Sequence, residues 1–407
     1  MTTRAWRWSA TFDALQQRNF RWLWLANLAN SATFQMGMVA QGWLVYELTG
    51  SALALSWVGS GWSISTLLLS LYGGVIADRV EKRRLILLMR LAMALNVVWL
   101  TVVIMTGAVR VWHLMANSLL SGVLMSFMMP AQITLVSDLV EKDTLLNAMS
   151  LSAIGMGLMG IVAASGAGLL IQNVGIAGVY WTITVLHLLS FVAITRLPRR
   201  EPIDSVRSSM WRELCEGIAN LRRQPVLVSL LVLGVTRILL GLSYTTFMPK
   251  YASEALNMDA SGLGILMGTP GIGGMASALV LASLGNLRGK GRLMLVAGAI
   301  LGCALCLFVQ VRWLPAVLVF LALAGAMGNL CMVTIETLFQ SVSTDEYRGR
   351  MMSIYMMSWG LSPVGTIPSG ALADRLGVPT VVTMQGALLT VIYLAFLWRG
   401  SKVRELE

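Results

Sequence analysis

The chain has 407 residues, of which 57% are hydrophobic and only 12% are charged. A water-soluble domain of this composition would lack the charged surface that keeps such domains in solution, so a soluble globular protein is excluded. The net charge of +11 would suit nucleic acid in a soluble protein. In a membrane protein the location of the charges matters more, and no nucleic-acid partner is expected.

Apolar stretches of about 20 residues recur along the chain, each long enough to cross a hydrocarbon core of about 30 Å. They predict an all-α polytopic membrane protein with twelve transmembrane helices. The first six expected spans are 20–46, 52–76, 84–106, 111–137, 146–172 and 176–197. The second six are 226–250, 261–284, 291–312, 314–340, 349–373 and 378–398.

Basic residues gather on one side of these spans. Those expected on the outer side are only Arg110, Lys250, Arg312 and Arg375, while Arg90 and Arg237 fall within spans. The other 24 of the 30 Lys and Arg residues lie in the tails and in the loops of the opposite side. The positive-inside rule therefore predicts a bacterial cytoplasmic (inner) membrane protein with both termini cytoplasmic. The first apolar stretch is too long for a signal peptide and is expected to remain as a helix.

The longest polar break follows the sixth span and divides the chain into 1–197, a linker at 198–225, and 226–407. Within the linker, apolar residues recur every three or four positions opposite charged ones, which predicts an amphipathic helix lying on the membrane. These apolar residues are Trp211, Leu214, Ile218 and Leu221. Short segments also repeat at an offset of 203 to 204 residues, such as Ser165-Gly166-Ala167 and Ser369-Gly370-Ala371. The repeat predicts two pseudo-symmetric six-helix bundles with a cavity between them.

Enzymatic chemistry has no support in the sequence. The four cysteines, including the Cys303 and Cys306 pair, fall in the linker or within apolar helices, so no metal site or disulfide is expected. No GxxxxGK[ST] loop is present, which disfavours ATP as the direct energy source. No cofactor is expected. The partners expected are membrane lipid, a small-molecule substrate and protons, and the protein is expected to be a monomer.

The loop after the second span carries a candidate gate. Its residues are Gly74, Asp78, Arg79, Lys82, Arg83 and Arg84. Asp78, at the cytoplasmic boundary, can accept hydrogen bonds from basic side chains or from the N-terminus of a neighbouring helix, and such a contact can form in one conformation only. The alternative is an ordinary basic cytoplasmic loop that contains one acid.

This loop resembles the signature of the major facilitator superfamily, with Glu81 in place of the second glycine. The segments Arg18-Asn19-Phe20-Arg21, Trp43 to Ala52 and Gly360 to Gly365 are similar to the branch of enterobactin-type siderophore exporters and macrolide efflux pumps, which are drug:proton antiporters of type 3. The resemblance covers nearly the whole chain. It implies the major facilitator fold, alternating access and proton antiport. Two antiporter signatures differ, because the fourth span lacks an arginine and Ala163-Ala164 replace a Gly-Pro pair.

Polar residues within the spans are costly in lipid and tend to face a cavity or one another. On the first span, five residues follow at intervals of three or four and so share one face, with helix packing as the alternative role. They are Asn27, Asn30, Phe34, Met38 and Gln41, joined by Asn117 and Gln132 on the fourth span and Asn329 on the tenth. The family's architecture places the first, fourth, seventh and tenth helices around the cavity. The 26 methionines would make such a cavity adaptable, or they only fill space between the helices of the membrane bundle.

Two charges fall on expected cavity helices, Arg237 on the seventh span and Glu336 on the tenth. They are candidates for substrate binding and proton coupling, or for a fixed polar contact. Arg90 and Asp374 lie nearer to the helix ends and are expected to extend toward the membrane surface.

The predicted function is a secondary active transporter that exports small amphipathic or hydrophobic molecules, drug-like or siderophore-like, by alternating access with proton coupling. A proton-coupled importer, or a lipid or metabolite carrier of the same fold, is the alternative. A non-transporting membrane sensor is a remote alternative, because the cytoplasmic segments are too short to hold a signalling domain.

Overall fold

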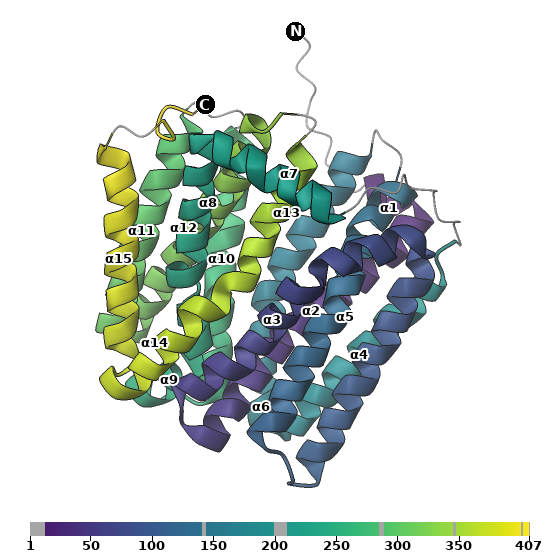
Figure 1. Ribbon diagram of the computed structural model, residues 1–407. Coiled ribbons are helices and arrows are strands. Elements are labelled where there is room, and N and C mark those ends of the chain that lie inside the picture. Colours follow the sequence, from purple (N-terminus) through teal and green to yellow (C-terminus); the bar gives the residue numbers. More distant parts are fainter. Residues whose placement is uncertain are drawn as a thin grey trace.

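The computed structural model describes residues 13–140, 144–198, 210–284, 289–344, 347–399 and 402–406. These residues form helices and connecting turns without a β-strand. In Figure 1 the helices stand side by side in two groups, and the short helix α1, the linker helix α7 and the C-terminal end lie at the same end of the molecule. The arrangement is the all-α membrane fold that the sequence predicts.

The first half consists of long helices joined by short turns. They are α2 (Arg18–Thr49), α3 (Ala52–Arg79), α4 (Lys82–Met105), α5 (Val111–Leu139) and α6 (Leu145–Thr195), preceded by α1 (Asp13–Gln16). The apolar stretch of α6 is 49 residues long, about 73 Å of helix and twice the width of a hydrocarbon core. Gly175 divides it into two spans with a φ of 76°, which a glycine adopts without the strain of a Cβ atom.

The second half repeats the pattern with more interruptions. Its helices are α8 (Pro225–Gly241), α9 (Ser243–Leu256), α10 (Ala260–Leu284), α11 (Lys290–Gln310), α12 (Leu314–Val342), α13 (Arg348–Met357), η2 (Ser358–Leu361), α14 (Ser362–Leu376) and α15 (Val378–Trp398). The expected seventh span is broken at Leu242 into α8 and α9. The expected eleventh span is interrupted by the 3₁₀ turn η2, which ends two residues before Pro363, and this proline has no N–H for a regular helical hydrogen bond.

Nine stretches within the described residues have both the length and the hydropathy of membrane spans. Two of them contain an interruption: Asn147–Thr195 is divided at Gly175, and Pro225–Leu256 comprises α8 and α9. Helix α2 is not among the nine, because amides such as Asn30 and Gln41 lower its hydropathy. Counting α6 twice, and counting α8 with α9 and α13 with η2 and α14 as single rods, gives twelve crossings.

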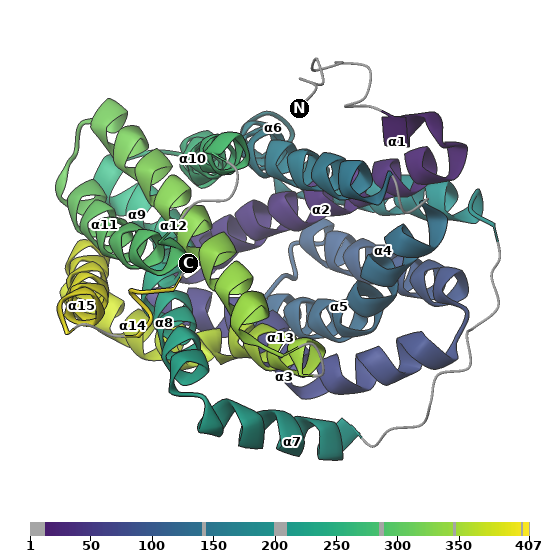
Figure 2. The same cartoon turned by 90° about the horizontal axis from the view of Figure 1, so that it is seen from above.

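The two halves meet along two pairs of helices, α6 against α10 and α3 against α14. Seen from the end that carries α7, the helices of each half form a separate group (Figure 2). Close approach of α6 and α10 depends on glycines, because a side chain at Gly168 would clash with the carbonyl oxygen of Ala260. A methyl group at Gly264 would lie 2.9 Å from the carbonyl oxygen of Ala164.

The amphipathic helix predicted in the linker forms as α7 (Met210–Arg223). It runs along the outside of the bundle (Figure 2), and Arg350 of α13 binds it through an ion pair of 2.9 Å to Glu216. Residues 199–209 of the linker lie outside the described residues. The boundaries of the three predicted segments stay a prediction.

Candidate functional site

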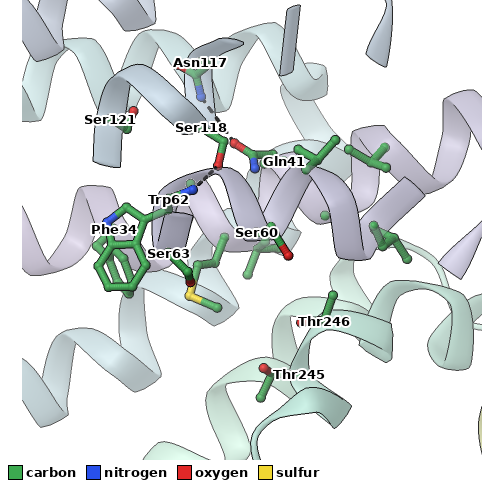
Figure 3. Close-up of a pocket in the computed structure, with 18 of the residues that line it drawn as sticks. Phe34, Gln41, Ser60, Trp62, Ser63, Asn117, Ser118, Ser121, Thr245 and Thr246 are labelled. Carbon is green, nitrogen blue, oxygen red and sulfur yellow. Dashed lines mark hydrogen bonds between the residues drawn. The ribbon is translucent and has the colours of Figure 1, made fainter. Parts of the chain in front are cut away.

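A cavity of about 480 Å³ lies between the two halves. Helices α2 to α6 of the first half and α8, α9, α10, η2 and α14 of the second contribute side chains to its wall. Cavities of this size hold drug-sized molecules. Figure 3 shows residues of α2, α3 and α5 facing Thr245 and Thr246 of α9 across the space.

Much of the wall is apolar and aromatic. Phe34 on α2 and Trp62 on α3 meet edge to face, with their ring centroids 6.1 Å apart (Figure 3). Phe34 is 46% exposed although it lies within the bundle, and so is Met38 at 40%, which indicates that both side chains border open space. Four methionines line the cavity, so part of the wall can adapt to ligands of different shapes, namely Met38, Met93, Met125 and Met267.

A chain of side-chain amides reaches the cavity from α4. Asn96 donates from its Nδ2 to the side-chain oxygen of Asn117, at 2.9 Å, and to the backbone oxygen of the same residue, at 3.3 Å. Asn117 on α5 donates in turn to Oε1 of Gln41 on α2, at 3.2 Å (Figure 3). Asn117 and Gln41 line the cavity. The chain fixes the orientation of both amides.

A buried arginine lies behind another part of the wall. Arg90 on α4 is 0% exposed, and one of its terminal nitrogens donates to Oδ1 of Asn30, a cavity residue on α2. Its Nε and Nη2 atoms have no hydrogen-bond partner among the described residues. The expectation that Arg90 extends toward the membrane surface is therefore wrong, because the packing of α4 against α5 and α6 encloses the side chain.

The residues predicted for the cavity do not lie together. Five of them line it, namely Asn30, Phe34, Met38, Gln41 and Asn117. Asn27 and Gln132 are hydrogen-bonded to each other, between α2 and α5, and are not part of the lining. Asn329 donates to α10, at 3.2 Å to the carbonyl of Gly274 and 3.0 Å to Ser277, a packing contact within the second half.

Arg237 and Glu336 lie behind the wall formed by the second half. Arg237 is 2% exposed and lies over the ring of Trp359, a cavity residue, with its guanidinium carbon 5.4 Å from the ring centroid. Its charge interacts electrostatically with Glu336, but these two described residues form no ion pair within 4 Å. Nε and Nη2 of Arg237 lack hydrogen-bond partners among the described residues.

Asp374, at the end of α14, binds the first turn of α3 in the other half. Its carboxylate accepts hydrogen bonds from the hydroxyl of Ser51 at 2.5 Å and from the backbone N–H groups of Ala52 at 2.7 Å and Leu53 at 3.1 Å. A carboxylate at a helix N-terminus pairs with unsatisfied N–H groups and with the helix dipole. Asp374, at the helix end, is therefore bound to the neighbouring helix and does not only extend toward the membrane surface.

Lys250 on α9 completes this contact. Its Nζ atom lies 2.8 Å from Oδ1 of Asp374 and donates to the backbone oxygen of Gly50 at 2.9 Å. We call the whole group the inter-half latch; it comprises Gly50, Ser51, Ala52, Leu53, Lys250 and Asp374. Partial burial raises the pKa of Asp374, but the hydrogen bonds from Lys250, from Ser51 and from two backbone N–H groups outweigh it and lower the pKa to about 2.

One sequence signal could have identified Asp374. The segment Gly370 to Arg375 repeats the spacing of glycine, alanine, aspartate and arginine found in Gly74 to Arg79. Because α3 and α14 pack together and run in opposite directions, the two aspartates come at opposite ends of this helix pair.

Part of the predicted gate is described only as backbone, because Gly74 and the residues Asp78 and Arg79, whose side chains lie outside the description, belong to α3. Arg83 donates to the carbonyl oxygens of Ile194 at 3.3 Å and Thr195 at 2.7 Å, which end α6. This contact stays within the first half and stabilises a helix C-terminus. Lys82 has an interaction partner within the protein, whereas the side chain of Arg84 is exposed.

Comparisons with known proteins agree with this architecture. The sequence profile of a family described as "Transmembrane secretion effector" matches residues 9–407. The staphyloferrin A transporter of Staphylococcus aureus (strain NCTC 8325 / PS 47) is 24% identical over 381 residues, covering 91% of this chain and 93% of the relative. The multidrug efflux pump Tap of Mycolicibacterium fortuitum is 26% identical over 355 residues, covering 84% and 86%.

Solved transporters share the fold. The nucleoside transporter NupG superposes with a TM-score of 0.74 at 14% identity, covering 93% of this chain and 98% of its own. A POT family transporter in complex with 5-aminolevulinic acid gives a TM-score of 0.77 at 12% identity, covering 95% and 97%. At such identities the likeness concerns the fold alone.

Proposed function

Because the chain belongs to the transmembrane secretion effector family of the major facilitator superfamily, we propose that it exports small amphipathic or hydrophobic molecules by alternating access. Members of this superfamily are transporters and not enzymes. The relatives named as a siderophore transporter and as a multidrug efflux pump support the export of organic molecules. The protein is an integral membrane protein, and we place it in a bacterial cytoplasmic membrane.

The observation that carries the proposal is a cavity between the halves next to a latch that joins them. The latch closes one end through bonds of 2.5 to 3.1 Å between Asp374 and the first turn of α3. These bonds involve one exposed hydroxyl, two backbone groups and a side chain that is 28% exposed, so they can be exchanged for bonds to water. Alternating access requires contacts of this kind, which form in one state and break in the other.

The distribution of basic residues supports an orientation in which the latch is periplasmic. Most Lys and Arg residues belong to the tails and to the loops at the α7 end, which the positive-inside rule assigns to the cytoplasm. With the latch closed, the cavity would accept substrate from the cytoplasm, the loading state of an exporter. Opening of the latch would then release the substrate outside.

Proton movement is the proposed source of energy. Glu336 is a half-buried carboxyl group whose charge interacts with that of Arg237 behind the cavity wall. A carboxyl group exposed alternately to the two sides of a membrane can bind a proton on one side and release it on the other.

Everted membrane vesicles test the proposed function. An efflux and susceptibility screen in an exporter-deficient host first identifies a transported compound. Everted vesicles containing the full-length protein should then accumulate this compound when their interior is made acidic, whereas vesicles without the protein should not. Accumulation in right-side-out vesicles instead would indicate an importer and contradict the proposal.

A further inference from the structure

The first observation is an unpaired positive charge beside the cavity. The guanidinium of Arg90 is fully buried, and two of its three nitrogens have no hydrogen-bond partner among the described residues. Arginine stays protonated in proteins and has only donors, so burial without an anion is unfavourable. Among the described residues its hydrogen bond is to Asn30, which lines the cavity.

The bond to Arg90 fixes the orientation of the Asn30 amide. Because arginine cannot accept a hydrogen bond, the atom of Asn30 that faces it must be the oxygen. The Nδ2 group of Asn30 is then the atom left to bind other partners. No hydrogen bond among the described residues uses this donor, and Asn30 lies on the cavity wall.

The amide chain from α4 leads to the same arrangement at Gln41. The backbone carbonyl of Asn117 can only accept, so the group of Asn96 that faces it is Nδ2. The same Nδ2 group donates to the side-chain oxygen of Asn117, which turns the Nδ2 of Asn117 toward Gln41. Gln41 therefore accepts through its oxygen and keeps its Nε2 donor for the cavity (Figure 3).

The rest of the lining offers no counter-ion for a cation. None of the described residues that line the cavity is an aspartate or a glutamate. On the side of the second half, Arg237 is another buried guanidinium behind Trp359, and Glu336 is the carboxyl group whose charge interacts with it. Both the charge and the oriented donors therefore favour a ligand that is negatively charged and rich in hydrogen-bond acceptors.

We infer that the cavity binds an amphipathic organic anion, with its charged group, such as a carboxylate, at the Asn30–Arg90 end. Gln41 follows Asn30 by eleven positions on α2, a rise of about 16 Å. Phe34 and Met38 lie between them on the same wall and would contact an apolar body. A neutral acceptor at the far end of the ligand would bind Gln41. This substrate class rests on the proposed function.

The probe for the test is 11-(dansylamino)undecanoate, which combines a carboxylate, an apolar chain and sulfonyl acceptors. Its matched cation carries an ammonium in place of the carboxylate. Saturable energy transfer from tryptophan to dansyl measures binding to the full-length protein in lipid nanodiscs, after subtraction of the signal from empty nanodiscs. We expect the wild-type protein to bind the anion at least tenfold more tightly than the cation.

The decisive variant is Asn30→Asp. It removes the free donor and adds a carboxylate that pairs with Arg90, so the protein should fold and melt no lower than the wild type. The anion should bind at least tenfold more weakly, and the preference should turn toward the cation. Asn173→Asp is the matched control, because Asn173 is exposed at the end of the first span of α6 and is not part of the lining.

Three results would overturn the inference: equal or tighter binding of the cation by the wild type, no saturable binding of the anion by folded protein, or an unchanged preference in Asn30→Asp. The everted-vesicle assay separates these failures from a failure of the proposed function. If vesicles still export a cationic or neutral compound from the screen, export stands and only the anionic substrate class is wrong.

Discussion

Replacing Asp374 by asparagine tests the inter-half latch. The carboxylate shares its two oxygens among Lys250, the hydroxyl of Ser51 and the N–H groups of Ala52 and Leu53. Asparagine keeps one oxygen, which can still accept from two of these donors, but its NH₂ group faces the other two and the negative charge is lost. The N–H of Leu53 then has no acceptor in the latch.

The size of the effect follows from these bonds. A hydrogen bond to a charged group contributes about 1.5–3 kcal/mol to stability, and partial exposure of Asp374, at 28%, reduces this value. We therefore expect the closed state to lose roughly 1–2 kcal/mol relative to the open state, a factor of about 5–30 in the ratio of their populations.

Spin labels at Arg110 and Arg312, two exposed residues in the α4–α5 and α11–α12 turns, report the separation of the halves. In a background without the native cysteines, Asp374→Asn should increase the population at longer distances. Asp259→Asn is the matched control, because Asp259 binds Ser261 and Gly262 at the start of α10 within its own half. A distribution that is unchanged in Asp374→Asn, or equally changed in Asp259→Asn, would refute the reasoning.

The pKa of Asp374 gives the same experiment a pH dependence. In the closed state the pKa is lowered from 3.8 to about 2, so ionisation favours closure above about pH 4. This contribution is lost as the pH falls from about 4 to about 2. Between pH 5 and pH 8 the latch should therefore not respond to pH, and any response there would indicate another titrating group.

The remaining predictions concern coupling, packing and the gate. The Glu336→Gln variant should still bind substrate, but its transport in liposomes should no longer depend on an imposed pH gradient. Transport that still follows the gradient would remove Glu336 as the coupling residue. Gly168→Val should clash with the Ala260 carbonyl and disfavour the closed state by about 1–3 kcal/mol, measured with the same spin labels, whereas Gly166→Val, which meets open space, should not. Asp78→Asn should reduce transport more than it reduces the amount of protein in the membrane, and normal transport would contradict the gating role.

The crossing segments could be predicted from sequence because a hydrocarbon core imposes both a length and a composition on each span. The interruptions could not be predicted in the same way. Leu242 separates α8 from α9 directly after Gly241, but Gly234 lies within α8 without a break, so a glycine alone does not mark the interruption. The residue after Leu242 is Ser243, whose hydroxyl bonds to the carbonyl of Leu239. Such a bond depends on a local rotamer and leaves no periodic signal in the sequence.

Helical spacing identified the cavity residues Asn30, Phe34 and Gln41 because positions three or four apart share a face. It could not separate Asn27 from them, since a face extends along the whole helix whereas a cavity occupies only part of its length. Arg90 lies eight residues, about 12 Å, from the start of α4, within reach of the membrane surface for a long side chain. Only the packing around α4 decides that it is buried. The roles of these residues in transport stay predictions.

The two halves contribute different kinds of groups to the inter-half latch, and this difference affects how the latch can be studied by mutagenesis. The second half supplies both charged side chains, Lys250 and Asp374, whereas the first half supplies one hydroxyl and otherwise only main-chain groups. An alanine scan of residues 50–53 would therefore leave most of the contact intact and would overlook this side of it. Apart from Ser51→Ala, which removes the one hydroxyl, only a change to the main chain, such as proline at position 53, would remove a donor there, so most of the first half's contribution to the latch does not depend on side-chain identity.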